Sequence, residues 1–225
     1  MRTIRRSSAV TLVAGDLEAV FLPGHGMLGA SLRHRHIEIL RRVQDLEVAA
    51  AKGSTAGIPL LHPWANRLAG PRYRAAGREV VLDPSWPLLH FDEHGLPMHG
   101  VPWSLLAWEL TEARQDRLAA RLEWSRRDLL AVFPFRHRLE LVATLGPDCL
   151  TLETTLVANR DGPAQVELLT GYAYAQIFAP KDKNYVALEP MTAPTNALTS
   201  GRGLQLVNPG GAFRAAFRIR IETAQ

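Results

Sequence analysis

Apolar and polar residues alternate with a period of two along most of this chain. From residue 150 to 157, leucines on one face alternate with Thr151, Glu153 and Thr155 on the other, which is typical of a strand buried on one face. Similar short runs, each stopped by Gly, Pro, Asn or Asp, are RHRLELVATL, RLAARLEWS, REVVLDPSW, NYVALEP and AFRAAFRIRIE. The pattern therefore predicts many short β-strands.

The N-terminal segment TLVAGDLEAVFLPGHGMLGASLRHRHIEILRR predicts three successive strands, broken at Ala14-Gly15 and from Pro23 to Gly26. The segment that follows, HIEILRRVQDLEVAAAKG, is ambiguous. Its apolar residues fit a helical face about as well as a strand followed by a loop.

Short strands at a spacing of about ten residues, with turn signals between them, predict an all-β protein, either a sandwich or a barrel. The chain lacks the alternation of strands and helices that indicates a parallel sheet. It also contains no internal repeat, low-complexity tract or linker. Residues 1–225 are therefore expected to form a single domain.

Composition narrows the functional classes. The 225 residues are 47% apolar and 21% charged, with a formal net charge of +4, which is typical of an ordinary globular protein. The arginines are scattered rather than gathered in one stripe, so no nucleic-acid partner is expected. The single cysteine, Cys149, can form no intrachain disulfide and demands no oxidising compartment. No apolar run has the length of a membrane helix, and the N-terminal apolar patch ends at Asp16, so the expected location is the cytoplasm.

The segment HFDEHGLPMHG superficially resembles a metal site, because it contains His90, Asp92, Glu93, His94 and His99. No helical histidine pair or second ligand cluster accompanies it, so no metal is expected. Histidines that serve as hydrogen-bond donors to a polar ligand fit the segment better. The chain also lacks a Gly-x-Ser-x-Gly elbow and a phosphate-binding glycine motif, which argues against acyl and phosphoryl transfer.

Polar side chains beside prolines and aromatics remain as candidates. Asn66 and Arg67 occur in GIPLLHPWANRLAG, His99 precedes Trp103, and Glu189 lies in ALEPMTAPTNAL. Planar polar groups suit sugar hydroxyls and aromatic surfaces suit the C–H faces of a sugar, so this set fits a carbohydrate. A purely structural interpretation is nearly as good. In it, Arg67 pairs with a carboxylate, the tryptophans belong to the core, and Glu189 is an exposed carboxylate at a strand end.

Taken together, the segments resemble the aldose 1-epimerase (galactose mutarotase) family. The matching segments occur in the order of the family and extend from about Gly57 to Pro209: PLLHPWANRLAGPRY, LPMHGVPWSLLAWEL, FPFRHRLELVATL, LVANRDG and YAYAQIFAPKDKNYVALEPMTAPTNAL.

The resemblance implies a large antiparallel β-sandwich that interconverts the α and β anomers of a hexose without a cofactor. It places Asn66 and Arg67 against sugar hydroxyls, with Trp103 as a further substrate contact. It makes Glu189 the catalytic base and His99 a sugar-contacting histidine. A base removes the proton of the anomeric hydroxyl while an acid protonates the ring oxygen, and the opened sugar then closes on its other face.

The chain departs from the family between Asn159 and Glu189. Family members carry a Gly-x-His-Pro-Tyr motif, whose histidine is the acid, and then several tens of residues with a sugar-binding aspartate. Here VELLTGYAYAQIFAP runs straight through, as though the ends of that region were joined at Gly171-Tyr172. The chain therefore resembles an internally shortened member that lacks the His-Pro-Tyr region.

Three hypotheses follow from the shortening. In the first, which the retained residues favour, the protein is an active isomerase in which His99, His94 or His62 takes the acid role. In the second, it is a catalytically impaired sugar-binding remnant. In the third, the shortened sheet has a new edge that a homodimer covers. The sequence names neither the sugar nor whether it is phosphorylated.

Overall fold

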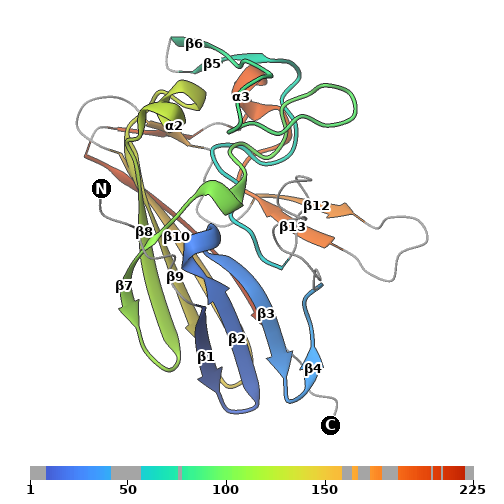
Figure 1. The fold of residues 1–225 in the computed structure, drawn as a ribbon, viewed down its shortest axis with the longest axis vertical. Coiled ribbons are helices and arrows are strands. Elements are labelled where there is room, and N and C mark those ends of the chain that lie inside the picture. Colours follow the sequence, from blue (N-terminus) through green and yellow to red (C-terminus); the bar gives the residue numbers. More distant parts are fainter. Residues whose placement is uncertain are drawn as a thin grey trace.

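The computed structural model describes residues 9–41, 57–75, 78–158, 164–166, 173–178, 187–203, 205–208 and 210–220. Antiparallel strands dominate this part of the chain (Figure 1). Its two α-helices, α2 (Arg127–Val132) and α3 (Ala197–Ser200), have six and four residues. Neither approaches the length that a helix needs to cross a membrane. The prediction of an all-β protein is confirmed.

The N-terminal strands form a four-stranded antiparallel sheet in chain order: β1 (Val10–Ala14), β2 (Leu17–Leu22), β3 (Leu28–His34) and β4 (Ile37–Glu38). Gly15, with a φ of +58°, lies in the first turn, and the 3₁₀ turn η1 (Pro23–His25) joins β2 to β3. The three predicted strands and both predicted breaks are therefore confirmed. Residues 42–53 of the ambiguous segment lie outside the described residues.

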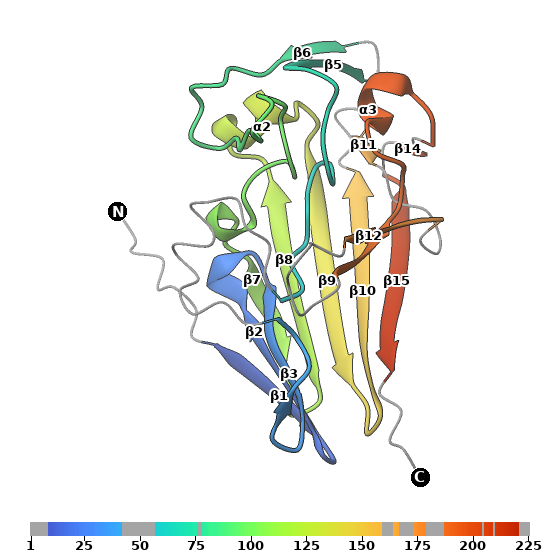
Figure 2. The same ribbon diagram turned by 90° about the vertical axis from the view of Figure 1, so that its right-hand side faces the viewer.

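A five-stranded antiparallel sheet forms the centre of the molecule, in the order β15-β10-β9-β8-β7. Figure 2 shows its long strands side by side. Its strands are β7 (Glu109–Ala113), β8 (Arg117–Trp124), β9 (His137–Leu145), β10 (Cys149–Ala158) and β15 (Ala212–Arg220). The register sets Leu150 opposite Leu145 and Leu156 opposite Leu139, so the leucines of neighbouring strands share one face.

The two sheets bury their apolar faces against each other. Leu12 and Phe21 of the first sheet and Leu118, Leu141 and Leu152 of the central sheet belong to one continuous buried cluster. Each fully buried leucine or phenylalanine contributes roughly 1.5–3 kcal/mol to folding. The other face of the central sheet carries charged side chains. This is the predicted antiparallel β-sandwich.

Three two-stranded ladders complete the described strands: β5 (Arg72–Ala75) with β6 (Arg78–Val81), β11 (Ala164–Val166) with β14 (Gln205–Val207), and β12 (Tyr174–Phe178) with β13 (Ala187–Met191). Figures 1 and 2 show the β12–β13 pair projecting from the central sheet on the side of β1–β4. The Gly171-Tyr172 position lies outside the described residues.

Two buried histidines join the central sheet to the loop that follows residue 57. His62 and His137 are 4% and 0% exposed, and their Nε2 atoms are 2.9 Å apart. Nδ1 of His137 lies 2.7 Å from the carbonyl oxygen of Phe135, so this nitrogen carries the proton and donates it. Nε2 of a neutral His137 is then the acceptor, and Nε2–H of His62 is the donor.

Both histidines stay uncharged in the folded protein. Burial lowers the pKa of His137 to about 4, and burial followed by the neighbouring His137 lowers the pKa of His62 well below 6.5. The stacked Trp124 ring, whose centroid is 5.4 Å from that of His137, covers the pair on one side. Protonation of either ring would therefore place a charge in the core.

We predict that stability falls as the pH falls from 6.5 towards 4. In that window the unfolded chain binds protons at both histidines and the folded chain does not, so acid favours the unfolded state. The free energy of unfolding should change by up to about 1.4 kcal/mol per pH unit for each histidine. Urea unfolding between pH 7.5 and pH 5 measures this slope.

The matched variants are His137→Gln, which removes one histidine of the buried pair, and His94→Gln, which replaces a histidine with an exposed side chain. The first should flatten the slope and the second should leave it unchanged. Equal slopes in all three proteins would refute the neutral buried pair.

Candidate functional site

Three short segments lie side by side beside the sandwich and form the candidate site. The amide of His99 donates to the oxygen of Asn66 (2.9 Å), and the amide of Leu68 donates to the oxygen of Pro97 (3.0 Å). On the other side, the amide of Met98 donates to the oxygen of His90 (2.8 Å). Residues 97–99 therefore run between residues 66–68 and residues 90–92. We call these three segments the cradle.

Asn66 is a hub of the cradle. It is 5% exposed and adopts the left-handed region with a φ of +58°, which asparagine tolerates better than most residues. Its backbone amide donates to Nδ1 of His99 (3.1 Å), and its side-chain amide donates to Oε1 of Gln176 on β12. The asparagine therefore joins the cradle to the β12–β13 pair.

His99 is held as one neutral tautomer. Its Nδ1 accepts the Asn66 amide, so the ring proton resides on Nε2, which remains a donor. Burial, then the charges of His90 and Arg67, lower the pKa of His99 to about 4. At neutral pH His99 is therefore an N–H donor without charge.

The backbone around His99 leaves little freedom. His99 itself has a φ of +60°, and Gly100 follows with a φ of +66°. A Cβ on Gly100 would lie 2.3 Å from the carbonyl oxygen of His62, so only glycine fits there. Val101 then donates its amide to the same oxygen (3.0 Å). The position of His99 is thus fixed from the buried His62.

Arg67 is held by Asp92. The Nε of Arg67 donates to Oδ2 of Asp92, while Oδ1 of that carboxylate accepts the amides of His94 and Leu96, both at 2.9 Å. The bond from Leu96, and then Arg67, lower the pKa of Asp92 to about 2. The Arg67 side chain is 39% exposed, and within the described residues only its Nε has a partner. Both terminal nitrogens of its guanidinium can therefore meet a ligand.

Glu189 lies opposite Gln176 on the β12–β13 pair. The register of β12 and β13 sets Glu189 directly opposite Gln176, and opposed residues of antiparallel strands project from the same face. Since Gln176 contacts Asn66, Glu189 lies on the face of the β12–β13 pair that meets the cradle. Glu189 is half-buried, and this burial raises its pKa. A raised pKa makes the carboxylate a stronger base.

The tryptophans lie in the interior. Trp103, in the 3₁₀ turn η2 (Trp103–Leu105), is 5% exposed, and Trp64 is 2% exposed beside Tyr73. A Cβ on Gly26 would lie 2.3 Å from the carbonyl oxygen of Trp103, which shows how closely η1 packs against η2. Trp103 thus offers a ligand little surface, and its role as a substrate contact stays a prediction.

The other expected histidines lie elsewhere. His62 is buried against His137, and the His94 side chain is 70% exposed, 3.6 Å from Glu93. Of the three histidines considered for the acid role, only His99 lies in the cradle. Across the described ranges, no three histidine, cysteine, aspartate or glutamate side chains are placed to share a metal ion.

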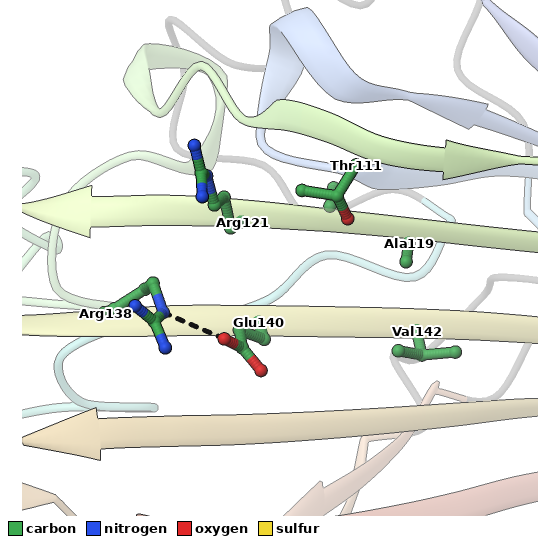
Figure 3. Close-up of a pocket in the computed structure, with 7 residues that line it drawn as sticks. Thr111, Ala119, Arg121, Arg138, Glu140 and Val142 are labelled. Carbon is green, nitrogen blue, oxygen red and sulfur yellow. Dashed lines mark hydrogen bonds and ion pairs between the residues drawn. The ribbon is translucent and has the colours of Figure 1, made fainter.

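A hollow on the outer face of the central sheet is a weaker candidate. It has a volume of about 330 Å³ and is lined by Thr111, Ala119, Ala120, Arg121, Arg138, Glu140 and Val142 (Figure 3). Both arginines are engaged, Arg121 with Glu109 (3.0 and 3.1 Å) and Arg138 with Glu140 (2.8 Å). Arg138 and Glu140 alternate along β9 with the buried His137 and Leu139, so this face is opposite the one that His62 contacts.

Sequence patterns missed two contributors. The sequence pattern indicates Asp92 only as a candidate metal ligand, although its position at the start of the turn DEHG is typical of a side chain that caps a turn. Gln176 occupies a polar position in an alternating strand, which ordinarily faces solvent. No local signal could have indicated its contact with Asn66, 110 positions earlier in the sequence.

Comparison with known proteins identifies the family of the chain. The family model for aldose 1-epimerase matches residues 9–170, and the match ends beside Gly171-Tyr172, where the family pattern is interrupted. No curated protein sequence matches the chain.

Solved structures share the fold. The Slr1438 protein of Synechocystis sp. PCC 6803 has a TM-score of 0.79 at 18% identity, over 100% of this chain and 99% of its own. A putative aldose 1-epimerase of Escherichia coli K12 has a TM-score of 0.70 at 17% identity, over 96% of this chain and 99% of its own. A galactose mutarotase-like protein of Clostridium acetobutylicum has a TM-score of 0.69 at 12% identity, over 94% of this chain and 95% of its own. With a family model that covers well over half of its length, the chain belongs to the aldose 1-epimerase family.

Proposed function

We propose that the protein is an aldose 1-epimerase that interconverts the α and β anomers of a hexose by opening the sugar ring. The observation that carries the proposal is the hydrogen-bonded series Gln176–Asn66–His99, with Glu189 opposite Gln176 on the neighbouring strand and Arg67 next to Asn66 in the chain. It brings together a half-buried carboxylate, an amide and a neutral imidazole from segments far apart in sequence. A protein that retained only the fold of the family would not require these polar groups to lie near one another.

Glu189 is the proposed base. Its carboxylate takes the proton of the anomeric hydroxyl, and the raised pKa brings it closer to the pH at which the reaction must run. The neutral Nε2–H of His99 donates a hydrogen bond to a sugar oxygen, as uncharged imidazoles do at other carbonyl-forming sites. Asn66 and Arg67 supply further donors for hydroxyl groups.

The family name supports a sugar as the ligand, and a free hexose is the form we propose. A phosphorylated hexose is the alternative, since Arg67 has two terminal nitrogens to offer an anion. The cytoplasm remains the expected compartment, because the single Cys149 asks for no oxidising environment. A homodimer remains a prediction, and β15 at the end of the central sheet is the edge that it would cover.

A binding-only protein is the second candidate. It is favoured by the sequence departure at Gly171-Tyr172, where the acid histidine of the family has no counterpart. Loss of a general acid commonly lowers a rate by about 10²–10⁴-fold. The two candidates therefore differ in turnover and agree in sugar binding.

Polarimetry of freshly dissolved α-glucose and α-galactose tests the proposal. The protein should accelerate mutarotation, and Glu189→Gln should lower the rate by about 10²–10⁴-fold because the base is lost. The rate should also fall as acid protonates Glu189, with a midpoint above the ordinary value near 4.3 because burial raises this pKa. Absence of acceleration by folded protein, together with sugar binding seen by NMR, would establish the binding-only alternative.

Asp92→Asn should weaken sugar binding by releasing Arg67. The asparagine keeps an oxygen for the amides of His94 and Leu96 but loses the charge that Arg67 meets. The ¹⁵N NMR signal of the Arg67 Nε–H should lose its protection from exchange, and the KM should rise with less effect on kcat. Asp83→Asn is the matched control, since Asp83 also caps a turn, at Ser85, but contacts no cradle residue. Unchanged Arg67 exchange in Asp92→Asn would contradict the anchoring role.

A further inference from the structure

Under the proposed function, on which this inference rests, ring opening needs a proton for the ring oxygen. Neither Glu189 nor His99 supplies that proton readily. Glu189 is the base, and His99 is fixed as a neutral donor whose Nδ1 accepts a backbone amide. A neutral imidazole N–H is a far weaker acid than an imidazolium. A second titratable group must therefore stand near His99.

The backbone places His90 in that position. His90 begins the 90–92 segment of the cradle, and its carbonyl oxygen accepts the amide of Met98, the residue before His99 (2.8 Å). His90 is half-buried. All eight histidines of the chain are at described positions. His90 and His99 are the two that lie within the cradle.

The two imidazoles lie close enough for a charge on one to affect the other. A charge on His90 is one of the causes that keep His99 unprotonated, after burial and ahead of Arg67. Since Nδ1 of His99 is occupied as an acceptor, His99 is the member of the pair that stays uncharged. The charged groups around His90 in the cradle are Arg67 and Asp92, which neutralise each other. One histidine is thus an uncharged donor, which leaves His90 as the second histidine of the cradle for a role in proton transfer.

We propose that His90 is the general acid of the epimerase reaction. Glu189 removes the proton of the anomeric hydroxyl, the carbonyl forms at C1, and the C1–ring oxygen bond breaks. The electron pair goes to the ring oxygen, which takes the proton of the His90 imidazolium. After rotation about C1–C2 the steps reverse, so Glu189 and His90 recover their original states and nothing is oxidised or reduced.

The arrangement of the segments suits these two roles. Glu189 lies opposite Gln176, which binds Asn66 on one side of the 97–99 segment, and His90 lies on the other side of that segment. The base and the acid therefore lie at the two ends of this arrangement, and the hydrogen-bond donors lie between them. A sugar held by Asn66 and His99 meets one proton-transfer group on each side.

The test compares His90→Gln with His94→Gln, which changes an exposed histidine four positions later in the same loop. Mutarotation is measured from pH 5.5 to pH 9, and binding is measured with 1,5-anhydroglucitol, a hexose analogue that has no anomeric hydroxyl and cannot open. His90→Gln should lower kcat by about 10²–10⁴-fold and alter the pH profile of kcat, with the Kd of the analogue changed less than about twofold. His94→Gln should behave as the wild type.

A second variant guards against a damaged fold. His90→Ala should regain part of its rate when free imidazole is added, as only a missing proton donor predicts. The inference is overturned if His90→Gln keeps its kcat, if kcat and analogue binding are lost together without rescue, or if the wild type binds the analogue but does not turn over. A wild type that neither binds nor turns over would refute the proposed function as well, so the two failures are distinguishable.

Discussion

The reciprocal bond between Asn66 and His99 holds the site together. Each residue donates its backbone amide to the other, one to an imidazole nitrogen and one to a carbonyl oxygen. Both adopt left-handed backbone geometry, which costs roughly 1–3 kcal/mol for a non-glycine residue and persists only where the surroundings enforce it. Here each residue holds the other in this geometry. The same pair of hydrogen bonds orders the two loops and selects the His99 tautomer.

The sandwich supplies the rigidity that this arrangement needs. His137 projects from the inner face of the central sheet and accepts the bond of His62, whose carbonyl oxygen then holds Val101 and leaves Gly100 no room for a side chain. The chain of support therefore runs from a buried strand to the residue after His99. Loops that carry chemistry gain precision in this way from a scaffold that cannot shift.

The sequence predicted the parts of this protein that depend on local pattern. Half-buried strands alternate visibly, so the sandwich could be inferred, and the resemblance named Asn66, Arg67, His99 and Glu189 as candidates. The sequence could not reveal what each residue touches. Arg67 is an example: it pairs with the carboxylate of Asp92, as the structural interpretation expected, and its partly exposed side chain has two terminal nitrogens without a partner in the described residues. Gln176 was invisible because its contact with Asn66 depends on how two distant segments pack.

Histidines of the same intrinsic chemistry acquire different properties from their surroundings. His62 and His137 lie in the core, where desolvation excludes a charge and each ring can only donate or accept. His99 is less deeply buried, but its Nδ1 accepts a hydrogen bond from the backbone amide of Asn66 and so carries no proton. His90 is half-buried in the neighbouring segment of the cradle, no hydrogen bond holds its ring within the described residues, and its charge opposes a proton on His99. Burial and hydrogen bonding thus separate structural, donating and proton-transfer roles among identical side chains, and in the cradle the proton-transfer role falls to the histidine whose ring is not held by a hydrogen bond.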